Sequence, residues 1–192
     1  GKVVVVTGGG SGIGLAIARA AAAQGAIPVI ADIEVAALNE ALRSLPDDTL
    51  AVTTDVSDLA SVEALRDAVL DRHGRVDVIC NNAGVIASAT TFRSRPWETP
   101  LGDWEWIWGV NFMGVLHGIR SFVPRMLENG EEGHIVNTAS MAGLLAGADP
   151  YTISKHSVVS LTEGIYKEFK GMGAKLSASV LCPGLIKTAI LE

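Results

Sequence analysis

Short apolar runs alternate with longer amphipathic stretches along the whole chain. Runs such as 3–6 are apolar at every position, which is typical of a strand in a parallel sheet that helices cover on both faces. The stretches between the runs carry apolar residues at helical spacing. We therefore predict strands over 3–7, 28–32, 49–53, 76–81, 134–139 and 176–182.

Helices are predicted between these strands. Gly25 and Gly74 are expected to end the first and third helices, and Pro46 ends the second because proline cannot continue a helix. Ser57 is the expected cap of the third helix, and Pro124 is a candidate kink in the fourth. The alternation predicts an α/β fold with a doubly wound parallel sheet in the order 3-2-1-4-5-6. The predicted helices cover 13–24, 35–45, 58–72, about 103–128 and about 151–170.

The first strand leads into a glycine-rich turn and then a helix. Residues 7–14 read Thr-Gly-Gly-Gly-Ser-Gly-Ile-Gly. Such a turn directs backbone N–H groups and the positive end of a helix dipole at one spot, where a pyrophosphate can bind. Side chains at Gly8, Gly12 and Gly14 would obstruct the turn, the phosphate and the helix–strand packing respectively. A tight turn without a ligand is the alternative, but the flanking strand and helix favour nucleotide binding.

Composition narrows the class of protein. With 192 residues, 48% hydrophobic and 19% charged, the chain is expected to form one well-packed domain over 1–192. A net charge of −6 and an isoelectric point near 5.2 disfavour nucleic acid and membranes as partners. No membrane span or signal peptide is expected. Cys80 and Cys182 are expected to be buried free thiols rather than a disulfide or metal site, which suits the cytoplasm.

Polar and small residues follow several predicted strands, at the sheet edge where ligands bind in such folds. Asp32 can accept hydrogen bonds from the adenosine ribose and would repel a 2′-phosphate, which favours NAD over NADP; a helix-capping role is the alternative. Asp55 is expected either to contact the adenine amino group or to stabilise a turn. The sequence Asn-Asn-Ala-Gly at 81–84 is suited to a wall close to the cofactor that also braces neighbouring strands.

Tyr151 and Lys155 share one face of the last predicted helix. Lowering a tyrosine pKa from near 10 to roughly 7 takes about 4 kcal/mol, which a nearby ammonium and an oxidised nicotinamide can supply. Ser140 follows the fifth strand, where its hydroxyl can hold a substrate oxygen. Thr138 is the second candidate for that hydroxyl, and we prefer Ser140.

Residues 7–14, 81–84, Asn111, Ser140, Tyr151 with Lys155, and 183–184 together resemble the short-chain dehydrogenase/reductase family. The resemblance implies a Rossmann fold, a nicotinamide cofactor and hydride transfer between an alcohol and a carbonyl, with a small-molecule substrate. It implies that Tyr151 is the general acid–base, that Lys155 binds the nicotinamide ribose and tunes Tyr151, and that Ser140 polarises the carbonyl. It also implies that Asn111 organises a water relay to Lys155, with helix distortion as its other role.

The cofactor is expected to be NAD, ahead of NADP, and its contacts follow from the same motifs. Thr188 resembles the position that contacts the nicotinamide carboxamide. The expected cofactor-binding residues are Gly8, Gly10, Ser11, Gly12, Ile13, Gly14, Asp32, Ile33, Asp55, Val56, Asn82, Ala83, Gly84, Tyr151, Lys155, Pro183, Gly184, Ile186 and Thr188.

The chain departs from the family pattern in length. Ser140 lies closer to Tyr151 than usual, and the chain stops at Glu192, before the seventh strand that family members use to cover the sheet edge. Because Gly1 is not an initiator residue, we expect a partial chain whose last strand, apolar on both faces, has an open edge. A non-catalytic nucleotide-binding module and an inactive truncated form are therefore the alternative functions.

The long helices 103–128 and 151–170 carry more apolar residues than one buried face needs. They are expected to pair with their symmetry mates in a homodimer or homotetramer, as the family resemblance also implies. Core packing or a subunit interface is the expected role of the tryptophans, ahead of substrate stacking. They are Trp97, Trp104, Trp106 and Trp108.

Overall fold

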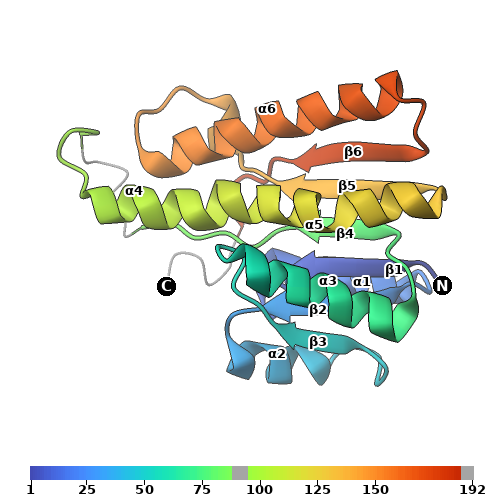
Figure 1. The fold of residues 1–192 in the computed structure, drawn as a ribbon. Coiled ribbons are helices and arrows are strands. Elements are labelled where there is room, and N and C mark those ends of the chain that lie inside the picture. Colours follow the sequence, from blue (N-terminus) through green and yellow to red (C-terminus); the bar gives the residue numbers. More distant parts are fainter. Residues whose placement is uncertain (88–94, 187–192) are drawn as a thin grey trace.

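Six parallel strands form one sheet through the middle of the molecule (Figure 1). The computed structural model describes residues 1–87 and 95–186. The strand order is β3-β2-β1-β4-β5-β6, which confirms the predicted doubly wound topology. The strands are β1 (Val3–Thr7), β2 (Ile27–Asp32), β3 (Leu50–Thr53), β4 (Val78–Asn81), β5 (Gly133–Thr138) and β6 (Leu176–Leu181).

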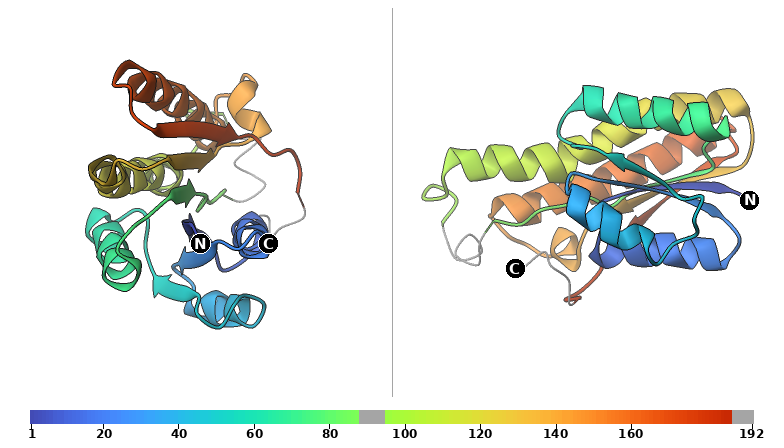
Figure 2. Two further views of the ribbon diagram at one scale, coloured as in Figure 1. Left: turned by 90° about the vertical axis from the view of Figure 1, so that its right-hand side faces the viewer. Right: turned by 90° about the horizontal axis from the view of Figure 1, so that it is seen from below.

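Helices cover the sheet on both faces. The left panel of Figure 2 shows α3, α5 and α6 on one side and α1 and α2 on the other. The helices are α1 (Gly12–Ala23), α2 (Val35–Leu42), α3 (Leu59–His73), α4 (Leu101–Trp108), α5 (Gly114–Asn129) and α6 (Pro150–Gly171). A π-helical turn, Gly109–Met113, joins α4 to α5, and a 3-10 turn, Met141–Leu144, precedes α6.

Successive residues of β1 enter two different cores. Val3 and Val5 pack with α3, α5 and α6 residues in a core that includes Phe122 and Leu65. Val4 and Val6 pack on the other face with residues of α1 and α2. Because side chains alternate along a strand, β1 is buried at every position, and this explains why its sequence is an unbroken apolar run.

Three predicted boundaries are wrong, and each has a local reason. Asp58, not Ser57, caps α3, because the Asp58 carboxylate accepts a hydrogen bond from the Ala60 N–H at 3.0 Å. The helix predicted over 35–45 ends at Leu42 in a turn that buries Leu45. The strand predicted from residue 76 begins at Val78. Asp77, just before it, is bound to Val3 of β1 twice: its backbone N–H donates to the Val3 carbonyl at 3.0 Å, and its carboxylate accepts the Val3 N–H at 2.7 Å.

The predicted helix over 103–128 is interrupted by the π-helical turn 109–113, which contains Asn111. The α5 helix then continues through Pro124 to Asn129. The Trp108 ring lies 5.0 Å from that of Phe112, so this tryptophan packs within its own helical segment. Trp97 and Trp106 are exposed, so they do not pack in the core of this chain.

The β6 strand pairs with β5 and forms one end of the described sheet, as predicted. It is not apolar on both faces. Ser179 is exposed, and its hydroxyl lies 2.8 Å from Nε2 of His134 on β5. The alternating serines of β6 therefore give one face of this strand a polar character, whereas Val180 on the other face packs with α5 and α6.

Candidate active site

The glycine turn has the backbone geometry that its sequence predicts. Gly8 has φ of 64°, and a Cβ atom there would lie 2.9 Å from Cα of Ala83. A Cβ atom on Gly14 would overlap the carbonyl oxygen of Gly8. Ser11 is the N-cap of α1 but makes no side-chain hydrogen bond to the first turn. The first N–H groups of α1 thus remain suited to a phosphate.

Asp32, at the end of β2, holds the glycine turn in place. Its Oδ2 accepts the Gly10 N–H at 3.0 Å, and its Oδ1 accepts the Glu34 N–H at 3.1 Å. The N-cap of α2 is Glu34, so Asp32 does not occupy the capping position. A carboxylate has about four acceptor sites, and these two bonds leave capacity for ribose hydroxyls. Ile33, the next predicted contact, is exposed.

Asp55 stabilises the loop after β3. Its Oδ1 accepts hydrogen bonds from the backbone N–H of Ser57 at 2.9 Å and from the Ser57 hydroxyl at 2.7 Å. The turn role that we considered for Asp55 is therefore present in the structure. The adjacent Val56 is buried, and its carbonyl oxygen lies 2.9 Å from Nδ1 of His117.

Three neighbouring strands are connected through Asn82. The hydroxyl oxygen of Thr7 accepts the N–H groups of Asn82 at 3.0 Å and Ala83 at 3.2 Å. In return, Nδ2 of Asn82 donates to the Thr7 carbonyl at 3.1 Å, and Oδ1 accepts the Thr138 hydroxyl at 3.2 Å. The predicted bracing by residues 81–84 is confirmed. Thr7 is not among the predicted site residues, and the signal for its role is its position directly before Gly8.

The Thr138 hydroxyl is committed to Asn82, which leaves Ser140 as the better candidate to hold a substrate oxygen. Ser140 begins the 3-10 turn, where its Oγ accepts the Ala142 N–H at 3.1 Å. Its hydroxyl is also hydrogen-bonded to the side chain of Tyr151. Sequence-distant residues from the end of β5 and the start of α6 are thus brought together.

Burial raises the pKa of the Tyr151 hydroxyl above its ordinary value of 10, as does the charge of Asp149, while the hydrogen bond with Ser140 opposes the shift. We expected Lys155 and an oxidised nicotinamide to lower this pKa. In the structure the effect of burial exceeds that of the Ser140 hydrogen bond, so the net shift of the Tyr151 pKa is upward. The Lys155 ammonium lies 5.7 Å from the centre of the Tyr151 ring.

Lys155 is buried in α6, and its Nζ donates to the Thr138 carbonyl at 3.0 Å. Burial lowers the pKa of this ammonium to about 8, and the interaction with Cys182 opposes the shift. A Cβ atom on Gly84 would lie 3.3 Å from both Lys155 Nζ and Asn111 Oδ1. The three residues therefore surround one point at the carboxyl edge of the sheet.

Asn111 pairs with the backbone of the loop after β4. Its Oδ1 accepts the Val85 N–H at 2.8 Å, and its Nδ2 donates to the Val85 carbonyl at 2.9 Å. A longer bond of 3.3 Å joins Nδ2 to the hydroxyl of Ser154. Its place in a π-helical turn agrees with the predicted helix distortion. The water relay to Lys155 stays a prediction.

Pro183, Gly184 and Ile186 follow β6, and the Pro183 carbonyl accepts the Met141 N–H at 2.9 Å, next to Ser140. Thr188 lies outside the described residues. Both cysteines are free, but only Cys80 is buried, so the prediction of two buried thiols is wrong for the half-buried Cys182.

Within 1–87 and 95–186, no cluster of His, Cys, Asp and Glu is suited to a metal ion. No helix in the same ranges is long and apolar enough to cross a membrane.

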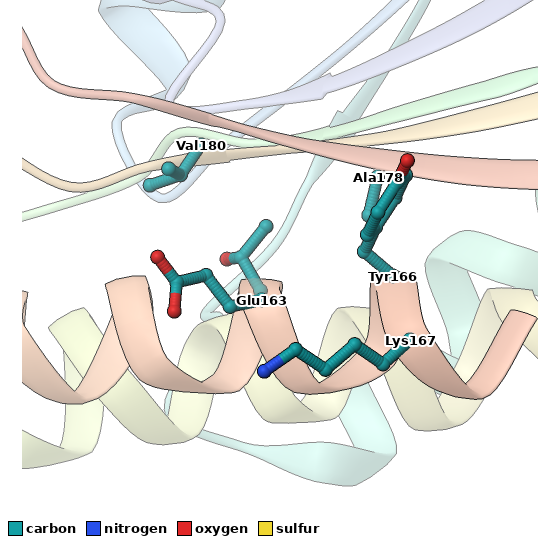
Figure 3. A pocket seen from close by; sticks show the side chains of 6 residues that line it. Glu163, Tyr166, Lys167, Ala178 and Val180 are labelled. Atoms are coloured by element: carbon teal, nitrogen blue, oxygen red, sulfur yellow. The ribbon is translucent and has the colours of Figure 1, made fainter. Parts of the chain in front are cut away.

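A separate groove of about 240 Å³ lies between the later turns of α6 and β6 (Figure 3). Tyr151 and Lys155 lie in the first turns of α6, so this groove is not the candidate active site. Its lining residues are Thr162, Glu163, Tyr166, Lys167, Ala178 and Val180.

The fold and the glycine turn are those of a nicotinamide-dependent oxidoreductase, and Ser140, Tyr151 and Lys155 are the candidate catalytic residues. Residues 2–192 match the short chain dehydrogenase family, and the chain belongs to this family. It is an oxidoreductase that transfers a hydride between a nicotinamide cofactor and an alcohol or carbonyl substrate.

The relatives of this chain include named dehydrogenases. The chain is 37% identical to 1-deoxy-11-beta-hydroxypentalenate dehydrogenase of Streptomyces exfoliatus, covering 100% of this chain and 70% of the relative. It is 40% identical to meso-2,3-butanediol dehydrogenase of Serratia marcescens, covering 97% and 72%. A short chain dehydrogenase/reductase from Burkholderia phymatum, solved in complex with NAD, has a TM-score of 0.93 and 46% identity, covering 99% and 68%.

Proposed function

We propose that this protein is an NAD-dependent dehydrogenase or carbonyl reductase in which Tyr151 is the general acid–base. The observation that supports it is the convergence of Ser140, Tyr151 and Lys155 beside Gly84, at the sheet edge that also carries the glycine turn. One domain over 1–192 would then hold both the cofactor and the catalytic residues.

The residues present fit a dinucleotide. The close approach of Gly8 to Ala83 and the first turn of α1 form a cradle for the pyrophosphate. Asp32 and Ile33 would contact the adenosine ribose, and Asp55 and Val56 the adenine. The remaining predicted contacts, toward the nicotinamide end, are Asn82, Ala83, Gly84, Tyr151, Lys155, Pro183, Gly184, Ile186 and Thr188.

When bound, the cofactor supplies the hydride donor or acceptor. Tyr151 exchanges a proton with the substrate oxygen, and Ser140 orients that oxygen through its hydroxyl. Burial lowers the pKa of the Lys155 ammonium to about 8. In the proposed mechanism this ammonium, together with an oxidised nicotinamide, would favour the phenolate of Tyr151 during proton transfer. Asn111 holds the backbone at Val85 close to this group.

Replacing Tyr151 with phenylalanine tests the mechanism. The phenol is removed and the ring kept, so kcat is expected to fall at least 10²-fold with little change in NADH affinity. Tyr166→Phe is the matched control, because Tyr166 is the other tyrosine of the chain and is exposed on α6. Near-normal kcat in Tyr151→Phe would reject the assignment. Cofactor binding by the wild type without turnover of any alcohol or ketone would favour a non-catalytic module.

We propose NAD rather than NADP because a carboxylate at the end of β2, such as Asp32, would accept the ribose hydroxyls and repel a 2′-phosphate. Titration of the protein with NADH and NADPH should show a preference for NADH of about 1–3 kcal/mol. Asp32→Asn should narrow this preference, because the charge is lost while an acceptor for Gly10 remains. Equal affinities in the wild type would contradict the assignment.

We also propose that the protein is a cytoplasmic homodimer or homotetramer. Free thiols at Cys80 and Cys182 suit a reducing compartment. Partly buried apolar residues on α5 and α6, such as Ile119 and Leu161, would pair with a second copy. Light scattering at micromolar concentration tests the association, and a monomer would contradict it.

A further inference from the structure

The loop after β3 packs against the helical segment that also contains Asn111. The Val56 carbonyl oxygen lies 2.9 Å from Nδ1 of His117, on α5. A carbonyl oxygen only accepts hydrogen bonds, so Nδ1 must carry the proton. Both residues are buried, each with 8% of its surface exposed. This contact joins positions 61 residues apart in the sequence.

Gly114, one helical turn before His117, packs against the same loop. A Cβ atom on Gly114 would lie 2.8 Å from Cγ2 of Val56, so only glycine leaves room for the valine side chain. Gly109 lies near the same loop, since its Cβ atom would lie 3.7 Å from Cβ of Ser57. The absence of a side chain at Gly114 therefore leaves space for the side chain of Val56. His117 forms a hydrogen bond with the carbonyl oxygen of the same residue.

We propose that His117 is a positioning residue for the adenine end of the cofactor site. This inference rests on the proposed function, in which Asp55 and Val56 contact the adenine. By fixing the Val56 carbonyl against α5, the imidazole sets the orientation of the peptide groups that present Asp55 and Val56 to the ligand. His117 itself does not touch the adenine.

The same helical segment holds the loop on the nicotinamide side. Asn111 fixes the backbone of Val85 with two hydrogen bonds, from within the π-helical turn that directly precedes α5. His117 and Asn111 thus attach the loops after β3 and β4 to one continuous helical segment, 109–129. Loss of the His117 bond should weaken recognition at the adenine end and leave the nicotinamide end intact.

The test compares three variants of the full-length protein in their affinity for AMP, for reduced nicotinamide mononucleotide and for NADH. His117→Leu removes the donor. His117→Asn places an amide nitrogen at the same distance from Cβ as Nδ1, whereas the matched control His117→Gln places it farther out. His117→Leu and His117→Gln should bind AMP and NADH on the order of tenfold more weakly, with unchanged binding of the mononucleotide. His117→Asn should keep most of the wild-type affinity for AMP and NADH.

Equal AMP affinity in the wild type and His117→Leu, with only the melting temperature lowered, would overturn the inference and leave the proposed function standing. A wild type that binds neither AMP nor NADH would overturn both.

If His117→Leu does not fold, ¹⁵N NMR of the wild-type histidines decides. We expect the Nδ1–H tautomer at His117, with a shift that changes on adding AMP and not on adding the mononucleotide. An Nε2–H tautomer, or no response to AMP, would overturn the inference.

Discussion

The strands β1 and β6 show how differently the centre and one end of the same sheet are built. All five residues of β1 are buried, whereas only Leu176 is buried in β6. The β1 strand lies between β2 and β4 and has helices on both faces, while β6 pairs with β5 at the end of the described sheet. Burial of a strand is therefore decided by its neighbours as much as by its own sequence.

The candidate active site spans these two regions. The glycine turn and Asp32 belong to the well-covered part, which we call the β1 region (β1–β3 with α1 and α2). Ser140, Tyr151 and Pro183 belong to the β6 region (β5, β6 and α6). Exposed apolar side chains border Ser140 there, including Met141 and Leu144. The glycine turn thus lies in the part of the sheet that helices cover on both faces, whereas Ser140 lies among exposed apolar side chains.

A pair of matched truncations should give the largest difference between the two regions. Ile30→Ala, in β2, deletes a side chain with no exposed surface and should cost about 3 kcal/mol of unfolding free energy. Leu181→Ala, in β6, deletes as many carbon atoms from a side chain that is 39% exposed and should cost less than about 1 kcal/mol. Urea denaturation measures both values. Similar losses would show that β6 is as tightly packed as β2.

Replacing Asp77, just before β4, should lower the free energy of unfolding by a smaller amount, and this loss should depend on pH. Burial raises the pKa of this carboxyl, but hydrogen bonds from Arg75 and from the Val3 N–H, 2.7 Å away, bring the pKa below its ordinary value. Because the folded pKa is depressed, the stabilisation is present above the unfolded pKa of 3.8 and is lost as the pH falls through the folded value.

The corresponding variant is Asp77→Asn, expected to cost about 1–2 kcal/mol at pH 7. Its difference from the wild type should shrink below about pH 4. The control is Asp47→Asn, on an exposed loop residue, which should change stability little at any pH. A wild-type advantage that persists unchanged at pH 2 would contradict the role given to Asp77.

Labelling of the two thiols should show a clear difference in reactivity between Cys80 and Cys182. Its effect on the fold is expected to be the smallest of those considered. Burial raises the pKa of Cys80, in β4, to about 12, so its thiolate is scarce at neutral pH. Cys182, after β6, is half-buried. A maleimide should label only Cys182 in the native protein, and both thiols in urea. Mass spectrometry of wild type and Cys182→Ala measures this, and equal native rates would contradict it.

The strand order could be predicted because parallel strands joined by right-handed helical crossovers favour a doubly wound sheet. The alternation of strands and helices, the glycine turn and the bracing by residues 81–84 were predictable from the amino-acid sequence alone. These features depend on local signals: apolar runs, glycine spacing, and residues that directly follow a strand. The positions of Ser140 and Tyr151 were also predicted, because the carboxyl ends of parallel strands meet at one edge of the sheet. The family motifs then assigned chemistry to these positions.

The partners of individual side chains could not be predicted before the fold was known. Asp32 binds Gly10, Thr138 is committed to Asn82, and the pKa of Tyr151 is raised because burial outweighs its hydrogen bond. The contact between His117 and Val56 likewise has no local signal. Each depends on atoms from distant parts of the chain, whose distance and burial exist only once the helices have packed on the sheet.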